Sequence, residues 1–364
     1  LGLIIFEDPC RPEVRSAIKY CYQNAIGVLM ITGDHPETAI AIAKDVGLGG
    51  TSPKVISAEI EPDKFKKSFL EINPDFLRQL DIVARCTPLQ KLEIVKSLRQ
   101  AGELVAVTGD GVNDVPALKA ADIAIAMGER GTRSAKEAAA IILVDDNFQT
   151  IVNAIIEGRQ LFFNLKIAFE YLLLIHIPFV LTAALIPLMG YPLLYLPVHI
   201  VWLELIIHPT ALFAFQKTAF KKNKNKKEYS KNYKEARFFS LADSVWIFVV
   251  GLLLSVVLAY DFIANQGENL HPDYGRTKAL LMLIVWSAGV VLIKTNLKNY
   301  GAFLVFCGSL LTVFLAVQIP FLTKILHITT LQLFDWLMTL SLVLAFLILY
   351  VIGKRITRSL SSTK

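Results

Sequence analysis

Two kinds of residue are scarce in this sequence, charged residues and cysteine. Charged residues make up 19% of its 364 residues, whereas apolar residues make up 54%. A single soluble domain is usually more charged than this, so the composition excludes one and predicts a soluble part joined to membrane-spanning helices. The four cysteines form neither a CxxC pair nor a metal-site spacing, which excludes a disulfide framework or a zinc site built from them. We expect reduced thiols that pack as small apolar groups.

Two further absences concern the amino-terminal end and the charge distribution. No signal peptide is visible, and the sequence begins at Leu1 inside an apolar run, so we expect it to be a piece of a longer protein. The net charge is +6, but the excess is concentrated in a few connecting segments. A general nucleic-acid-binding surface is therefore a poor explanation of the charge, and we expect no nucleic-acid partner.

The most informative stretch reads VTGDGVNDVPALKAADIAIAM. Its beginning, Leu104–Val107, is typical of a buried parallel strand, and a glycine-bracketed turn follows at the carboxyl end, where open α/β sheets place ligands. Asp110, Asn113 and Asp114 lie within five residues of one another. Carboxylate and amide oxygens this close suit Mg²⁺. Val115–Ala121 is predicted to be a helix, because a proline occupies its first turn.

This stretch, TGDGVND followed by PALKAADIAIAMG, resembles the hinge motif of P-type ATPases, the cation pumps that form an aspartyl-phosphate intermediate. The alternative is an ordinary loop with acidic surface residues. The resemblance implies that Asp110 and Asp114 hold Mg²⁺ and that Asn113 supports the site. It also implies ATP as the phosphoryl donor of the complete protein.

A second strand–loop–helix unit precedes the first. The apolar run Gly27–Ile31 leads into Thr32, Gly33 and Asp34, and Glu37–Val46 has helical spacing. The unit resembles the TGD motif of the same family. The resemblance implies that the Thr32 hydroxyl and the Gly33 amide hold phosphoryl oxygens while Asp34 positions groups around the metal. The alternative is a capped turn.

The segment ARCTPLQK resembles the phosphate-binding lysine segment of the family, which places Lys91 near the transferred phosphoryl group. The alternative is a surface lysine. Between the motifs, residues 47–81 are polar and irregular, and we expect surface segments there. The loop from Met127 to Thr132 is one residue longer than the calcium-pump pattern.

The alternation of strand, loop and helix over residues 1–150 predicts a doubly wound α/β domain, and the motifs make it resemble the haloacid-dehalogenase type. The family's phosphorylated aspartate lies in a DKTGT motif, which this sequence lacks, as it lacks the nucleotide-binding domain. The chain thus resembles the second half of the phosphorylation domain together with the membrane helices beyond it. By itself it is not expected to form the phosphoenzyme, and the missing amino-terminal part of the same pump would be its partner.

Asp145–Phe148 resembles the segment that leads into the family's fifth membrane helix, so residues 151–168 are predicted to be a stalk helix and residues 169–364 a bundle of about six membrane helices. The apolar segments are Phe169–Met189, Pro192–Phe215, Leu241–Ile263, Ala279–Ile293, Ala302–Phe321 and Leu331–Ile352, of which the fourth is short. Basic residues gather in Lys217–Arg237, in the link after the fourth segment and in the tail. The positive-inside rule then places the soluble domain and the carboxy terminus in the cytoplasm, with membrane lipid around the helices.

Ionisable residues in the first two spans indicate the transport site. His176 lies two residues before a proline, and Glu204 and His208 lie one helical turn apart, again before a proline. Such groups are costly in a membrane and usually functional, and proline frees backbone carbonyls that can act as ligands. The alternative is that these side chains only cross-link helices.

The region resembles the calcium-type subgroup but departs from it where calcium pumps carry ligands. This chain has His176 and Phe179 in place of Asn and Glu, and Glu204, Ile207 and His208 in place of Asn, Thr and Asp. One carboxylate is too few for calcium. Two imidazoles and a carboxylate suit a borderline transition metal or a proton, and the sequence leaves both open.

The sequence thus predicts part of a P-type ATPase that couples ATP hydrolysis to cation movement. Two alternatives remain: a catalytically inactive membrane protein derived from a pump, and a membrane-tethered phosphatase of the haloacid-dehalogenase type. The missing nucleophilic aspartate and the stalk argue against the phosphatase.

Overall fold

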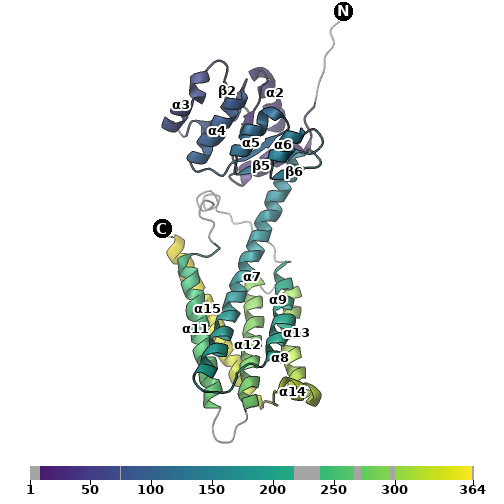
Figure 1. Ribbon diagram of the computed structural model, residues 1–364, viewed down its shortest axis with the longest axis vertical. Helices are drawn as coiled ribbons and strands as arrows, with labels where there is room; N and C mark the ends of the chain where they lie inside the picture. Colours follow the sequence, from purple (N-terminus) through teal and green to yellow (C-terminus); the bar gives the residue numbers. More distant parts are fainter. Residues whose placement is uncertain (1–8, 74, 217–237, 266–271, 296–299, 363–364) are drawn as a thin grey trace, which may run out of the picture. The chain divides into compact units, whose positions relative to one another are not determined.

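The computed structural model describes residues 9–73, 75–216, 238–265, 272–295 and 300–362 (Figure 1). The chain divides into two compact units at residues 158 and 159. We call the part up to Gly158 the α/β unit and the helical part from Arg159 onward the membrane unit.

The α/β unit contains two parallel three-stranded sheets among the described residues. The first has the order β1-β3-β2, and the second has the order β4-β5-β6. In the first sheet Met30 pairs with Ile82, and in the second Thr108 pairs with Ile125. The strands are β1 (Met30–Ile31), β2 (Val55–Ser57), β3 (Ile82–Ala84), β4 (Ala106–Gly109), β5 (Ile123–Met127) and β6 (Ile141–Leu143). The predicted α/β fold is therefore confirmed, and the strands that carry the two TGD loops, β1 and β4, are each an edge strand.

Six α-helices accompany these strands: α1 (Glu13–Gln23), α2 (Pro36–Val46), α3 (Lys67–Ile72), α4 (Pro88–Gln100), α5 (Val115–Ala120) and α6 (Arg133–Ala138). Local sequence explains the ends of two of the longer ones. Helix α2 begins with His35 as its cap and a proline in the first turn, and it ends at Gly47, whose φ is +76°. Helix α4 begins with a capping box made by Thr87 and Gln90.

Residues 47–81 are more ordered than the sequence predicts. They contain β2, a 3₁₀ turn at Pro62–Phe65, α3 and a second 3₁₀ turn at Leu77–Gln79. Phe65, Leu70 and Leu77 are almost fully buried and pack in one hydrophobic cluster with Ile94. The expectation of surface segments is wrong here, because a few widely spaced apolar residues in a polar segment are enough to dock it on a neighbouring helix.

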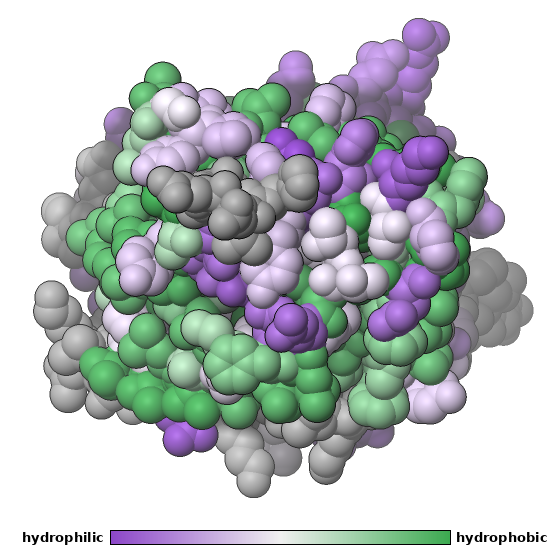
Figure 2. Space-filling model, turned by 90° about the horizontal axis from the view of Figure 1, so that it is seen from below, coloured by the Kyte–Doolittle hydropathy of each residue, from purple (hydrophilic) through white to green (hydrophobic). Residues whose placement is uncertain are grey.

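Among the described residues, six helices are long and apolar enough to span a membrane, and the first of them begins within the α/β unit and continues into the membrane unit. They are α7 (Phe148–Leu188), the span α8 (Pro197–Trp202) with α9 (His208–Gln216), α11 (Leu241–Ala264), α12 (Pro272–Thr295), α13 (Tyr300–Gln318) and α15 (Leu333–Ser362). A short helix α14 (Pro320–Leu326) follows α13, because Pro320 begins a new helix. In Figure 2 hydrophobic side chains line the rim of the lower end, whereas hydrophilic ones gather nearer its middle. The basic loop Lys217–Arg237 lies outside the described residues.

The fourth span is longer than the sequence predicts. Helix α12 has 24 residues, and 83% of its most apolar window is buried. Its first turns carry charges that shorten the apolar run, but these charges are paired: Lys278 Nζ lies 2.7 Å from Asp261 Oδ1, and Arg276 Nη1 lies 2.6 Å from Asp273 Oδ1. The paired charges allow the helix to extend beyond the apolar run.

Candidate functional site

The β4 loop is organised around the carboxylate of Asp114. Its Oδ1 accepts a hydrogen bond from Lys91 Nζ at 2.8 Å, and its Oδ2 accepts from the backbone amides of Asp110 and Gly111 at 3.4 and 3.3 Å. Lys91 and Asp114 are largely shielded, with side chains 21% and 13% exposed. The packing requires a glycine at position 109, because a Cβ there would lie 2.6 Å from the Cβ of Asp114. The structure thus brings Lys91 to the loop, a contact that links α4 to β4.

Asp110 and Asn113 are exposed at the carboxyl end of β4. Among the described residues, the Asp110 carboxylate has no hydrogen-bond or ion-pair partner, so both of its oxygens can accept a metal or its waters. Both oxygens of Asp114 already accept hydrogen bonds. The set fits Mg²⁺, which takes one or two carboxylates and keeps several waters. The Asp110 carboxylate is the one of the two that is open to a metal, whereas Asp114 is engaged by Lys91 and two backbone amides.

The first TGD loop belongs to the other sheet and forms its own hydrogen bonds. Thr32 Oγ1 donates to Asp34 Oδ2 at 2.8 Å and accepts from the Asp34 amide at 3.1 Å. Gly33 and Asp34 are exposed. Among the described residues, no hydrogen bond or ion pair joins this loop to Asp110 or Asp114. The structure therefore joins Lys91 to the second motif by a direct contact, whereas no hydrogen bond among the described residues joins the first motif to either of them.

A carboxylate that sequence pattern does not reveal holds the loop after β5. Asp146 Oδ1 accepts from the amides of Gly128 and Glu129 at 2.5 and 3.1 Å, and Oδ2 accepts from the Arg130 amide at 2.9 Å. Burial raises the pKa of Asp146, but the three amide hydrogen bonds lower it by more in sum, and the net pKa lies below its ordinary value. We call this arrangement the Asp146 clasp.

The Asp146 clasp connects the β4 loop to the start of helix α7. The amide of Thr132, just beyond the held loop, donates to the carbonyl of Asp110 at 2.7 Å. Helix α7 begins at Phe148, two residues after the clasp. The extra residue between Met127 and Thr132 is a sequence signal for such an anchored loop. The anchor, Asp146, lies 16 to 18 residues away, so a local pattern does not identify it.

In the membrane unit, the three ionisable residues predicted as a transport site lie together. His176 Nε2 is 3.1 Å from Glu204 Oε1, and His208 Nδ1 is 3.3 Å from Glu204 Oε2. One ligand atom from each residue lies within 4.8 Å of the other two. Glu204 lies in a π-helical segment, Leu203–Ile207, between α8 and α9. Such bulges often occur at functional sites, because the wider turn re-aims side chains.

The surroundings of the cluster differ on its two sides. His208 is 3% exposed, whereas the side chains of His176 and Glu204 are 35% and 41% exposed. Phe179 packs against Tyr195, with ring centroids 4.8 Å apart, and offers no ligand. We call His176, Glu204 and His208 the HEH cluster.

The structure shows where the carbonyl freed by the proline of the first span is used. Pro178 leaves the carbonyl of Leu174 without its helical partner, which makes this carbonyl a candidate ligand. In the structure it accepts a hydrogen bond from the indole Nε1 of Trp286 at 3.0 Å. The freed carbonyl therefore joins α7 to α12 through one of its two lone pairs.

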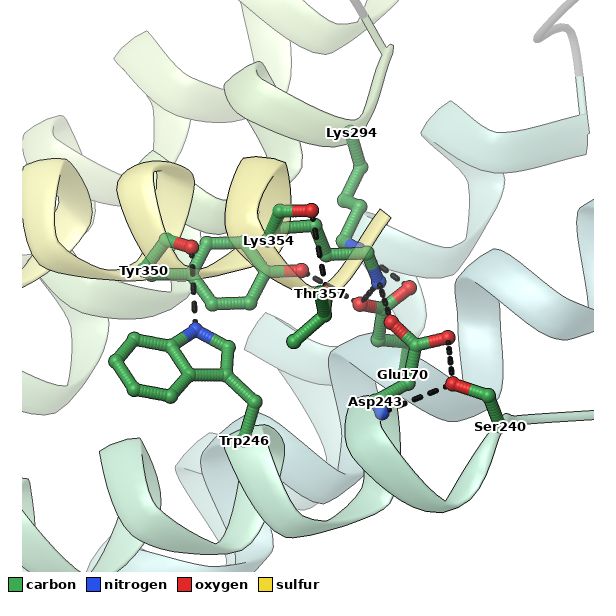
Figure 3. Close-up of polar contacts among 8 residues, drawn as sticks. All are labelled: Glu170, Ser240, Asp243, Trp246, Lys294, Tyr350, Lys354 and Thr357. Carbon is green, nitrogen blue, oxygen red and sulfur yellow. Dashed lines mark hydrogen bonds and ion pairs between the residues drawn. The ribbon is translucent and has the colours of Figure 1, made fainter. Parts of the chain in front are cut away.

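A second polar cluster lies between four helices of the membrane unit (Figure 3). Glu170 on α7 is 3% exposed. Its Oε2 lies 2.5 Å from Lys294 Nζ of α12. Its Oε1 accepts hydrogen bonds from two residues of α15, from Lys354 Nζ and, at 2.6 Å, from the Tyr350 hydroxyl. Asp243 of α11 lies 3.8 Å from Lys354. The sequence assigns both lysines to basic connecting segments on the cytoplasmic side. They are instead buried, because their partner is a carboxylate more than 100 residues away.

Comparisons with known proteins match both parts of the chain. Residues 1–122 match the family of haloacid dehalogenase-like hydrolases, and residues 192–356 match the family described as cation transporting ATPase, C-terminus. A calcium-transporting ATPase of Bacillus subtilis is 33% identical over 354 residues, which cover 94% of this chain and 39% of that protein.

Two eukaryotic relatives match shorter stretches. An endoplasmic reticulum-type calcium-transporting ATPase of Arabidopsis thaliana is 40% identical over 210 residues, 57% of this chain and 19% of that protein. The calcium-transporting ATPase 1 of Saccharomyces cerevisiae is 44% identical over 165 residues, 45% of this chain and 17% of that protein. The chain therefore spans well under half the length of the curated relatives it matches. With its two TGD loops, its α/β unit and its six apolar helices, the chain belongs to the family of P-type cation-transporting ATPases.

Proposed function

We propose that this chain is the carboxy-terminal portion of a pump that couples ATP hydrolysis, through an aspartyl-phosphate, to the movement of a cation across a membrane. The observation that carries the proposal is the Lys91–Asp114 pair beside the unpartnered carboxylate of Asp110 among the described residues. A shielded cation next to an open carboxylate suits a site where a phosphoryl group and a divalent metal meet, since the lysine neutralises phosphoryl charge and the carboxylate holds the metal.

Each predicted residue then has a role in phosphoryl transfer. Asp110 holds Mg²⁺, which neutralises charge on the phosphoryl oxygens when it is bound, with Asp114 beside it and Asn113 supporting the loop. Lys91 turns from Asp114 toward a phosphoryl oxygen. The Thr32 hydroxyl and the Gly33 amide hold further oxygens, and Asp34 orients Thr32 through the hydrogen bond between them.

Coupling to the membrane runs through helix α7 in this proposal. The helix is 41 residues long and carries His176 in its second half, while its first residue follows the Asp146 clasp. A change at the Asp110 loop is passed to the clasp through Thr132 and from there to the helix. The HEH cluster is the site through which the cation passes.

The orientation follows from the positive-inside rule. We place the α/β unit and the carboxy terminus in the cytoplasm, with membrane lipid around the six helices. The rest of the pump, including the aspartate that is phosphorylated and the nucleotide-binding domain, is the partner that this portion requires. The curated relatives are calcium-transporting ATPases. The HEH cluster, with one carboxylate, differs from the oxygen-rich site that calcium prefers.

The substitution Asp110→Asn in the complete protein tests the proposal. We expect loss of ATP hydrolysis, because the amide cannot balance the charge of the metal. Asp63→Asn is the matched control, since the Asp63 side chain is 83% exposed and lies far from any motif in the sequence. Unchanged hydrolysis in the Asp110 variant would refute the assignment. Phosphate release from small phosphoesters by the 364-residue chain alone would support the tethered phosphatase instead.

A further inference from the structure

We infer that the HEH cluster binds a divalent transition metal of the zinc class, through one nitrogen of His176, one nitrogen of His208 and the carboxylate of Glu204. The role of that metal as the transported ion rests on the proposed function, whereas its binding does not. The cluster combines two imidazoles and one carboxylate, which is a ligand set suited to such metals.

The hydrogen bond of His176 determines which nitrogen faces the cluster. Nδ1 lies 2.9 Å from the carbonyl oxygen of Leu172, and a carbonyl can only accept, so Nδ1 carries the hydrogen. In the neutral ring Nε2 is then an acceptor, and it lies 3.1 Å from Glu204 Oε1, another acceptor. Two lone pairs at this distance repel each other unless a cation lies between them. A second ring nitrogen that donates to a backbone carbonyl is the usual arrangement of metal-binding histidines.

The second imidazole is buried without hydrogen bonds. His208 is 3% exposed, and neither ring nitrogen has a hydrogen-bond partner among the described residues. Nδ1 is 3.3 Å from Glu204 Oε2, but the geometry is not that of a hydrogen bond. An unsatisfied polar group in an apolar setting is costly, so this ring needs a partner that the protein's own groups do not supply.

The separations of the ligand atoms fit a small tetrahedral ion. Ligands on zinc are about 3.4 Å apart, given metal–ligand bonds of about 2.1 Å. The two contacts to Glu204 measure 3.1 and 3.3 Å, and the widest pair of ligand atoms is at most 4.8 Å apart. Three protein ligands with an exposed side leave one position open, as in zinc sites that exchange a ligand.

Calcium and the proton fit less well. Calcium needs about six to eight oxygens, and this cluster supplies a single carboxylate beside two imidazoles. A proton between His176 and Glu204 would join that pair but would leave His208 without a partner. A metal satisfies all three side chains at once.

The test is metal binding to the 364-residue chain, purified in detergent with a tag that contains no histidine. We expect one Zn²⁺ per chain by calorimetry, visible d–d absorption of tetrahedral Co²⁺, and little displacement by excess Ca²⁺. The variants Glu204→Gln and His208→Asn should each weaken Zn²⁺ binding by about tenfold or more. His35→Ser is the matched control, because this exposed histidine caps α2 and serine can replace the cap.

Size-exclusion profiles and thermal unfolding without metal show whether each variant is folded, and Zn²⁺ should raise the unfolding temperature of the parent chain but not of Glu204→Gln. Equal Zn²⁺ binding in the parent and in both cluster variants would overturn the inference, and so would Ca²⁺ binding in preference to Zn²⁺. The absence of any metal binding would overturn it as well, and this is the result expected for a proton site. If Zn²⁺ does not bind but the complete protein still hydrolyses ATP in an Asp110-dependent way, the inference fails and the proposed function stands.

Discussion

The Glu170 cluster makes a quantitative prediction about stability. Glu170, Lys294 and Lys354 have side chains that are 4%, 9% and 15% exposed, so their charges are almost entirely removed from solvent. The substitution Glu170→Gln keeps the shape but leaves two buried ammonium groups facing a neutral amide. Removing one partner of a buried pair costs about 3–5 kcal/mol, because the remaining charge is uncompensated. Asp243 lies 3.8 Å from Lys354 and offsets part of this cost for that lysine, so we expect a value toward the lower end of the range.

The same reasoning predicts a rescue. Replacing all three charges together, as Glu170→Leu with Lys294→Met and Lys354→Met, removes the uncompensated charge, and such replacements of buried pairs are often neutral or stabilising. We therefore expect the triple variant to regain most of the stability lost by Glu170→Gln. An exposed pair supplies the control: Glu137→Gln breaks the contact with Arg133, and the two side chains are 64% and 92% exposed, so stability should change by less than about 0.5 kcal/mol.

The assay is equilibrium unfolding of the detergent-solubilised chain, followed by tryptophan fluorescence. Trp246 donates to the carbonyl of Tyr350 within the cluster, so its emission reports local opening. A free-energy loss below about 1 kcal/mol for Glu170→Gln would refute the reasoning, because it would mean that water reaches the lysines and that the cluster is not a buried one. A triple variant less stable than the single one would refute it as well.

Three further predictions concern the α/β unit. Asp146→Ala should lower ATP hydrolysis by the complete protein, although Asp146 contacts no phosphate. The folded pKa of Asp146 is depressed, so its stabilising effect should be present above pH about 4 and should vanish as the pH falls through the folded pKa. A pH series of unfolding measurements checks this. Gly109→Ala should destabilise the unit by about 1–3 kcal/mol in denaturant unfolding, because the new methyl group collides with Asp114; an unchanged midpoint would contradict this. Burial raises the pKa of the Cys86 thiol to about 11, so iodoacetamide should modify this thiol slowly at pH 8. The contribution of the neutral thiol to stability should be complete below about pH 8.5 and lost as the pH rises through 11.

Local pattern is sufficient where chemistry and chain order coincide. The β4 loop and the six spans follow from it, and the pairing of Glu204 with His208 follows from helical spacing. The sequence also predicts His176 as a site residue, although its contact with Glu204 joins two separate helical segments and does not follow from local spacing. The same kind of contact explains what the sequence does not reveal: it assigns Lys294 only to a basic link, because the partner of this lysine on α7 lies 124 residues away and the sequence alone does not show which distant side chains meet.

The short strands of the α/β unit show a different limit. β1 has only two residues, and burial within residues 47–81 depends on a few apolar side chains that dock on α4. Periodicity is a weak signal in such short segments, because a strand of two or three residues completes barely one alternation. The packing of the folded unit, and not a local preference of the chain, determines their structure.

The open sheet edges at β1 and β4 have a consequence for handling the protein. β1 and β4 each lie at the end of a sheet, and Ala106 and Thr108 of β4 are exposed, which is unusual because parallel strands are normally covered on both faces. Unpaired amide and carbonyl groups along such an edge are a template for β-augmentation. In the complete pump a donated strand can occupy this position. At high concentration of the isolated chain, the same edges invite strand exchange between copies, so aggregation should begin in the α/β unit and not at the lipid-facing helices.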